Sequence, residues 1–131
     1  GDGVKLRLLT PMRIQKNGVP LGADALTPRS VLMTLVRRVT LLSFYQNSEP
    51  IELDFKAFAK ETDEVQMQVD MGWKDWTRYS SRQKQTMSLG GVVGTIELKN
   101  LNPIMKVFLV VGTLTHVGKN ASFGMGKYVI E

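Results

Sequence analysis

Two helix-capping residues that are each followed by proline constrain the fold of this chain more than any other feature. They form the pairs Thr27-Pro28 and Asn102-Pro103, in which the first residue is a favoured N-cap and proline suits the first helical position. After each pair, apolar residues recur at helical spacing, from Val31 to Leu42 and from Ile104 to Leu114. The sequence therefore predicts two helices, the first ending near Tyr45, where helix-breaking residues begin.

The rest of the apolar pattern has the period of two that is typical of strands. It predicts four strands, over residues 4–14, 65–73, 92–98 and 127–130. Thr10-Pro11 is expected to kink the first strand, since proline cannot donate a ladder hydrogen bond. Residues 51–62 show neither period clearly, and we interpret them as mostly connecting chain.

The order strand, helix, strand, strand, helix, strand is that of the split βαβ pattern. We therefore predict an α+β, ferredoxin-like fold, related to RNA-recognition modules, with four antiparallel strands and two helices on one face. The other face of the sheet would be open, and RNA-recognition modules of this architecture use that face. The second and third strands should form a hairpin, with Trp73 in the core and a long polar stretch between them.

Composition narrows the class of protein further. The 131 residues are the usual size of one domain, and they include no cysteine and one histidine, so thiolate and histidine-rich metal sites are excluded. No apolar run is long enough to cross a bilayer. Seventeen Lys and Arg against twelve Asp and Glu give a net charge of +5, which favours a polyanionic partner. We expect a cytoplasmic protein that needs no metal or cofactor.

The stretch between the second predicted helix and the last strand is glycine-rich and basic. Its glycines leave backbone N–H groups unshielded, so the loop is suited to hold phosphates. Lysines add charge, Ser122 adds a hydroxyl donor, and Phe123 adds a surface on which a base can stack. The candidate RNA-binding residues here are Gly118, Lys119, Ser122, Phe123, Gly124, Gly126 and Lys127. The alternative is a simple turn. The glycine spacing fits neither a P-loop nor a dinucleotide fingerprint.

A second basic stretch lies between Trp73 and Leu89, where cations alternate with aromatic residues. Cations engage phosphates and aromatic rings stack on exposed bases, so this hairpin is a candidate RNA contact. Its candidate residues are Arg78, Tyr79, Arg82 and Lys84. Arg13 and Lys16 would extend the basic surface. The alternative is a solvated hairpin tip.

His116, the single imidazole, follows the second predicted helix and adjoins the glycine-rich loop. It is a candidate acid or base for attack by a ribose 2′-hydroxyl. The alternative is a hydrogen bond that anchors the loop or the helix end. No other acid–base or nucleophilic arrangement stands out.

Four motifs in order make the chain resemble the C-terminal domain of the CRISPR-associated repeat-processing endoribonucleases, in the repeat-associated mysterious protein superfamily. They are Leu8-Leu9-Thr10-Pro11-Met12-Arg13-Ile14, Trp76-Thr77-Arg78-Tyr79-Ser80-Ser81-Arg82-Gln83, Leu89-Gly90-Gly91-Val92-Val93-Gly94 and the stretch from His116 to Tyr128. The resemblance implies two tandem ferredoxin-like domains, of which residues 1–131 would be the second. It also implies that the glycine-rich loop and the hairpin contact the RNA.

By the same resemblance, the reaction is metal-independent cleavage within the repeat of precursor CRISPR RNA. The family's usual catalytic histidine belongs to the first domain, so this chain alone is expected to bind RNA with little or no cleavage. The alternative is a non-catalytic RNA-binding or scaffold subunit of a CRISPR effector complex, with other CRISPR-associated proteins as partners. A generic protein-interaction domain is a third interpretation, which the placement of the charges disfavours.

Overall fold

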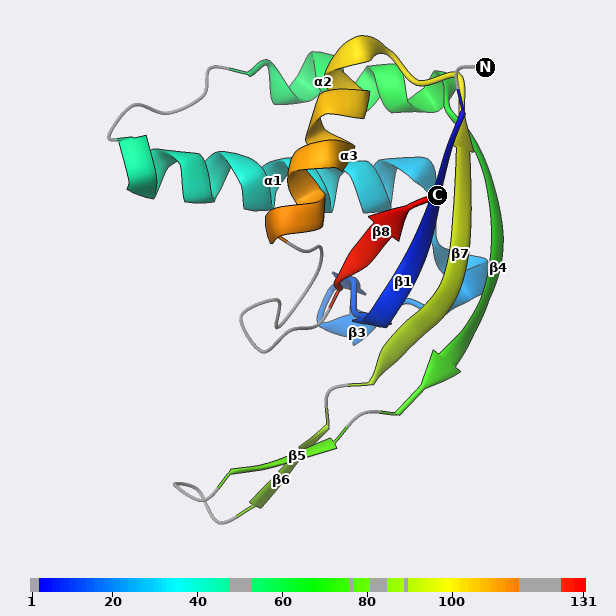
Figure 1. Ribbon diagram of the computed structural model, residues 1–131, viewed down its shortest axis with the longest axis vertical. Coiled ribbons are helices and arrows are strands. Elements are labelled where there is room, and N and C mark those ends of the chain that lie inside the picture. The colour runs from blue at the N-terminus through cyan, green and yellow to red at the C-terminus, as the bar shows by residue number, and fades with distance from the viewer. Residues whose placement is uncertain (1–2, 48–52, 76, 81–84, 89, 116–125) are drawn as a thin grey trace.

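A four-stranded antiparallel sheet organises the chain (Figure 1). The computed structural model describes residues 3–47, 53–75, 77–80, 85–88, 90–115 and 126–131. Across the sheet the order is β4 (Gln66–Lys74), β7 (Gly91–Lys99), β1 (Val4–Met12) and β8 (Tyr128–Ile130). Every neighbouring pair is antiparallel, and β4 and β7 form the predicted hairpin. The ferredoxin-like fold predicted from the order of elements is confirmed.

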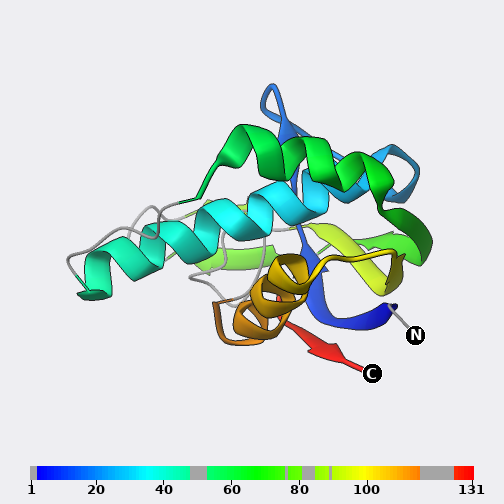
Figure 2. The ribbon, with the colours of Figure 1, turned by 90° about the horizontal axis from the view of Figure 1, so that it is seen from above.

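Three helices cover one face of this sheet: α1 (Pro28–Asn47), α2 (Phe55–Glu61) and α3 (Pro103–Thr115). Seen from above, α1 and α2 run side by side and α3 crosses the same layer near β8 (Figure 2). The core lies between helices and sheet, where Leu6, Leu8 and Ile96 from the strands meet Leu32 and Leu35 from α1. Burying each such side chain contributes about 1.5–3 kcal/mol, so this layer contact stabilises most of the fold.

Both predicted helix caps form. At the start of α1, the Ser30 N–H donates to Thr27 Oγ1 at 3.0 Å, and the Thr27 N–H donates to Ser30 Oγ at 3.0 Å. At the start of α3, the Met105 N–H donates to Asn102 Oδ1 at 2.9 Å. Each cap satisfies an N–H that has no partner within its own helix, which fixes where the helix begins.

The interpretation of residues 51–62 as mostly connecting chain is wrong, because Phe55–Glu61 form α2. Asp54 caps this helix by accepting from the Ala57 N–H at 3.0 Å. Seven residues are too few to show a helical period, and only Phe58 and Ala59 are buried. The Phe58 ring contacts Phe108 of α3 edge to face, with centroids 5.9 Å apart. Packing against α3 therefore stabilises this helix, which is too short to be evident from the sequence.

Tyr128 of β8 connects the sheet to α3. Its side chain is buried, and its hydroxyl donates to the Leu109 carbonyl at 2.6 Å. Gly112 makes room for it, because a Cβ at that position would lie 2.1 Å from the Tyr128 oxygen. Burial raises the pKa of the Tyr128 hydroxyl well above its usual value of 10.0, so this group stays protonated and donating.

We expect Tyr128→Phe to lower the free energy of unfolding by about 1–1.5 kcal/mol at neutral pH, since the Leu109 carbonyl loses its donor. The folded protein holds the tyrosine proton more tightly than the unfolded chain. The stabilisation is therefore complete below the usual pKa of 10.0 and declines as the pH rises above it. Urea unfolding of both proteins at neutral pH and above pH 10 measures the difference. An unchanged difference at high pH would contradict this linkage.

Two small hairpins extend from the main layers. The first pairs β2 (Gln15–Lys16) with β3 (Val19–Pro20) around an Asn17-Gly18 turn, in which both central residues have positive φ, at 55° and 79°. The second pairs β5 (Thr77–Ser80) with β6 (Gln85–Ser88) and continues beyond the ends of β4 and β7 (Figure 1). Short 3-10 turns occupy Ala23–Ala25 and Thr62–Glu64.

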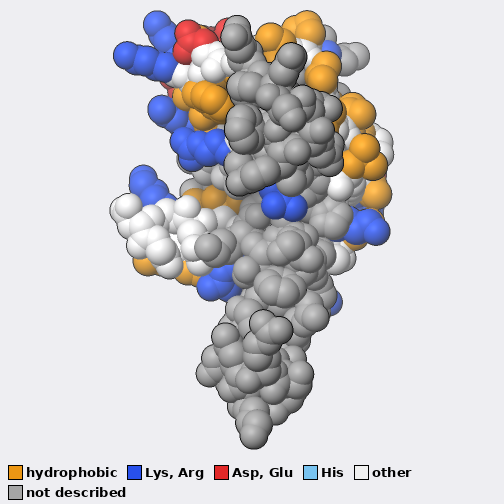
Figure 3. Space-filling view, turned by 90° about the vertical axis from the view of Figure 1, so that its left-hand side faces the viewer, with side chains coloured by type: hydrophobic (Ala, Val, Ile, Leu, Met, Phe, Trp, Pro, Cys, Tyr) orange, Lys and Arg blue, Asp and Glu red, His pale blue; other side chains and the backbone are white. Residues whose placement is uncertain are grey.

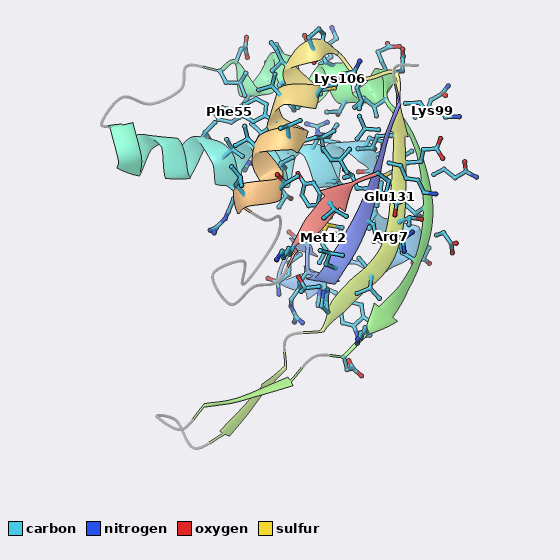
Figure 4. The ribbon with its side chains drawn as sticks, viewed as in Figure 1. Arg7, Met12, Phe55, Lys99, Lys106 and Glu131 are labelled. Carbon is cyan, nitrogen blue, oxygen red and sulfur yellow. The ribbon has the colours of Figure 1, made fainter. Side chains whose placement is uncertain are left out.

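The open face of the sheet carries charges of both signs. Arg7 on β1 forms an ion pair with Glu131 (Figure 4), and its hydrogen bond lowers the pKa of that carboxyl. In the next row Lys5 lies opposite Glu97. A face that alternates cations and carboxylates attracts a polyanion less than an all-basic one does. Of the basic candidates within the described residues, Arg78 lies on β5 and Arg13 bonds to Gly90 at the end of the sheet where β5 and β6 project.

Exposed hydrophobic side chains form a patch on one side of the molecule. In Figure 3 they follow much of the right-hand margin, while lysines and arginines occur on both sides and are more numerous on the left. Helix α3 contributes exposed aliphatic residues, namely Ile104, Val107, Val110 and Leu114. Within the part of the chain that the structure describes, no helix is both long and apolar enough to span a bilayer.

Candidate functional site

The end of the glycine-rich loop is held by the kink in the first strand. The Gly126 N–H donates to the Pro11 carbonyl at 2.8 Å, and the Lys127 N–H donates to Thr10 Oγ1 at 2.9 Å. In return, the Leu9 N–H donates to the Lys127 carbonyl at 2.8 Å. The loop therefore enters β8 in a fixed position beside β1.

The kink itself comes from an irregularity in the pairing of β1 with β7. Leu8 pairs with Gly94 and Met12 pairs with Val92, so four steps along β1 match two steps along β7. The extra residues in β1 form a bulge, which turns polar backbone groups away from the ladder. The Pro11 carbonyl and the Thr10 hydroxyl thus accept hydrogen bonds from the end of the loop, and the predicted kink is confirmed.

The root of the basic hairpin is fixed by the same segment of chain. One step beyond Met12, the Arg13 guanidinium donates from Nη1 to the Gly90 carbonyl at 3.0 Å. The next residue, Gly91, has no room for a side chain, because a Cβ would lie 2.5 Å from the Met12 carbonyl oxygen. Residues 10–13 therefore hold both the loop end and the hairpin root.

Trp73 lies at the end of β4, next to that root. The prediction that it belongs to the core is wrong, since 46 % of its surface is exposed. Its indole N–H donates to Asp75 Oδ1 at 2.9 Å, and a Cβ on Gly90 would lie 3.0 Å from its Cζ2 atom. Strand β4 extends beyond the helices at this end. Alternation points Trp73 toward the helix side of the sheet, but no helix covers it there. Trp73 instead offers an anchored aromatic surface.

Few of the sequence-predicted site residues lie in the part that the structure describes. Gly126 adopts a positive φ of 74°, a conformation that favours glycine, and Lys127 is exposed beside it. Arg78 and Tyr79 belong to strand β5. The other candidates lie outside the described residues, namely Arg82, Lys84, His116, Gly118, Lys119, Ser122, Phe123 and Gly124.

Sequence reasoning missed the holding roles of Thr10 and Arg13 and the exposure of Trp73. For Thr10 a signal was present, because a threonine before a strand-breaking proline marks a bulge whose hydroxyl can bond to another segment. For Arg13 and Trp73 no local signal exists, since their partners are set by how β4 and β7 end. Among the described residues, no three His, Asp or Glu side chains gather as metal ligands would.

Solved structures share this fold over almost the whole chain. A Cas6-RT-Cas1–Cas2 complex matches with a TM-score of 0.70 at 18% identity, covering 98% of this chain and 22% of that one. Thermus thermophilus Cas6 matches with a TM-score of 0.67 at 15% identity, covering 99% and 53%. A Cas6 product complex gives 0.65 at 19% identity, covering 100% and 52%. The chain thus spans about half the length of the separate Cas6 proteins.

At such identities the structural likeness establishes the fold and no more. A comparison with curated proteins gives no match. The model of the family described as CRISPR-associated endoribonuclease Cas6 matches residues 6–128, which include the kink, the hairpin and the glycine-rich loop. With nearly all of its length matched, the chain belongs to the CRISPR-associated endoribonuclease Cas6 family.

Proposed function

We propose that this chain is the RNA-binding, C-terminal domain of an endoribonuclease that processes precursor CRISPR RNA within the repeat. The observation that carries the proposal is the dual role of residues 10–13, which hold the end of the glycine-rich loop and the root of the basic hairpin. Two candidate RNA-binding segments far apart in sequence are thereby tied to one end of the sheet. Membership of the Cas6 family supports RNA as the ligand.

In this proposal the loop, the hairpin and the first domain have different roles, which follow from their chemical groups. Backbone N–H groups and lysines of the loop bind phosphates, and the hairpin cations and aromatics bind neighbouring phosphates and bases. Trp73 adds a stacking surface at the hairpin root. Cleavage by ribose 2′-hydroxyl attack needs an acid or base, and we place it in a first domain that would account for the other half of a Cas6 protein.

His116 then has an anchoring role. The proposal includes this role of His116. It also includes cleavage without a metal, a two-domain organisation and a cytoplasmic location. Other CRISPR-associated proteins are the proposed partners, since one structure with this fold is a Cas6-RT-Cas1–Cas2 complex.

The test compares this chain with the full protein on a labelled repeat RNA transcribed from a CRISPR array of the same genome, with and without a chelator. We expect the chain to bind without cutting and the full protein to cut in both conditions. His116→Ala in the full protein should lose less activity than replacement of a histidine in its first domain. If the full protein binds but never cuts, the non-catalytic alternative replaces the proposal. Loss of cutting with the chelator would contradict metal independence.

Thr10 offers a sharp test of how the loop is held. We expect Thr10→Val to weaken repeat-RNA binding about three- to tenfold, because the Lys127 N–H loses its hydroxyl acceptor and the loop end is no longer fixed. Thr10→Ser, which keeps the hydroxyl, is the matched control and should bind like the wild type. Fluorescence anisotropy titrations measure both affinities. Equal affinities for Val and Ser would show that this hydrogen bond does not contribute to RNA binding.

A further inference from the structure

A cavity on the helix side of the molecule has a lining that the proposed loop and hairpin site does not use. It has a volume of about 330 Å³ and lies between the small β2–β3 hairpin and the first three turns of α1. Its charged lining residues are Lys16, Arg29 and Arg37, and no carboxylate of the described chain lines it. Three other cavities among the described residues are each lined by at least one glutamate. This cavity is therefore distinguished by its charge.

The three cations come from two elements that border the cavity. Arg29 and Arg37 are eight residues apart on α1, which places them about two turns apart on one side of the helix. Lys16 approaches from β2, which the Asn17-Gly18 turn folds back onto β3. Within the described residues, none of these three side chains forms an ion pair. Three cations without a paired carboxylate give the lining a positive charge, which favours a bound anion.

The floor of the cavity is apolar. Ile14 and Met33 line it, and both belong to the hydrophobic core. An apolar floor beneath cationic walls suits a ligand that has an anionic group next to a flat or apolar part. A nucleotide unit within an RNA strand combines a phosphate with a base in this way.

The position of the cavity along the chain links it to the proposed site. Thr10 and Pro11 hold the glycine-rich loop, Arg13 holds the hairpin root, and the next residues, Ile14 to Lys16, line the cavity. Residues 10–16 thus run past the end of the glycine-rich loop, the root of the hairpin and the cavity, in that order. An RNA strand that leaves the loop and hairpin along this segment would reach the cavity.

We infer that this cavity, lined by Lys16, Arg29 and Arg37, binds a phosphate and its adjoining base from a single-stranded part of the RNA, outside the part held by loop and hairpin. The inference rests on the proposed function. It adds a second phosphate site, on the helix side of the domain.

The test uses the full chain and a labelled repeat RNA carrying ten extra nucleotides at each end. We expect K16Q/R29Q/R37Q to bind this RNA about tenfold more weakly than the wild type. The slope of log affinity against log salt should become shallower by about 0.7, because the cavity is proposed to hold one phosphate of a single strand. Arg29→Lys with Arg37→Lys keeps the charges and should retain most of the affinity.

The matched control is K56A/K60A/K99A, which removes the same number of charges from residues that do not line the cavity. It should change affinity and salt slope much less. A second readout needs no variant: bound RNA should protect Lys16, but not Lys56, from acetylation. Thermal unfolding of each variant confirms that it folds.

The outcomes separate the two proposals. Failure of the wild-type chain to bind any repeat RNA overturns the proposed function and this inference together. Binding that leaves Lys16 unprotected, with K16Q/R29Q/R37Q no weaker than the control triple variant, overturns the cavity alone. Protection of Lys16 together with the shallower salt slope supports it.

Discussion

Simultaneous replacement of Arg82, Lys119 and Lys127 by alanine is expected to weaken repeat-RNA binding by on the order of 100-fold at moderate salt. Each cation is proposed to neutralise one phosphate. The slope of log affinity against log salt should therefore become shallower by about 2. Lys127 sits where the loop joins β8, and its backbone is bonded to Thr10. Anisotropy titrations over a series of salt concentrations measure both quantities.

Two control variants make this result specific. R82K/K119R/K127R keeps every charge and should retain most of the affinity, whereas K56A/K60A/K99A removes three charges elsewhere. If the two alanine variants bind equally weakly and the charge-keeping variant binds like the wild type, net charge alone governs binding and the loop and hairpin have no special role. An unchanged affinity in the alanine variant would remove both segments from the proposed function.

Gly94→Ala is expected to destabilise the fold by more than about 3 kcal/mol. Gly94 lies in the middle of β7 and pairs with Leu8 on one side and Met71 on the other. Its φ is +133°, which side chains rarely permit, and a Cβ would lie 2.2 Å from the Asp70 carbonyl oxygen. Backbone cannot move aside as the end of a flexible side chain can, so the central strand must shift. Urea unfolding measures the loss.

Gly72→Ala is the matched control, since Gly72 lies on neighbouring β4 and a Cβ there would meet nothing within 4 Å. It should change stability by less than about 0.5 kcal/mol. Comparable losses in the two variants would show that the close approach at Gly94 is not the cause of the destabilisation. A fully stable Gly94→Ala protein would contradict the close approach of β7 and β4.

The fold was predictable because its signals are local. The two cap-plus-proline pairs, the helical stripes and the alternation over residues 65–73 depend on neighbours within a few residues, and the structure confirms each. Helix α2 was not predictable, because its seven residues depend on Phe58 meeting Phe108, fifty positions away. The misplacement of Trp73 has a similar cause. Alternation predicts which way a strand residue points, but not whether a helix lies over it.

In the proposed site, too, some features can be read from the sequence and others depend on tertiary contacts. The composition of the loop and hairpin, with their glycines, cations and aromatics, can be read from the sequence because it concerns which chemical groups are present. Their common support by Thr10, Pro11 and Arg13 cannot, because it depends on a bulge that brings residue 10 to residue 127 and residue 13 to residue 90. The cation-lined cavity is likewise formed by two elements that only folding brings together.

For this protein the sequence by itself determined the order of the four sheet strands with α1 and α3, the starts of these two helices, and the chemical groups suited to phosphates. These follow from backbone preferences and from periodicity, which act over a few residues. The tertiary structure alone decided which segments meet at one end of the sheet, which aromatic ring is left exposed and where cations from separate elements converge. Such contacts depend on packing and strand register between segments far apart in the chain, which no local pattern specifies.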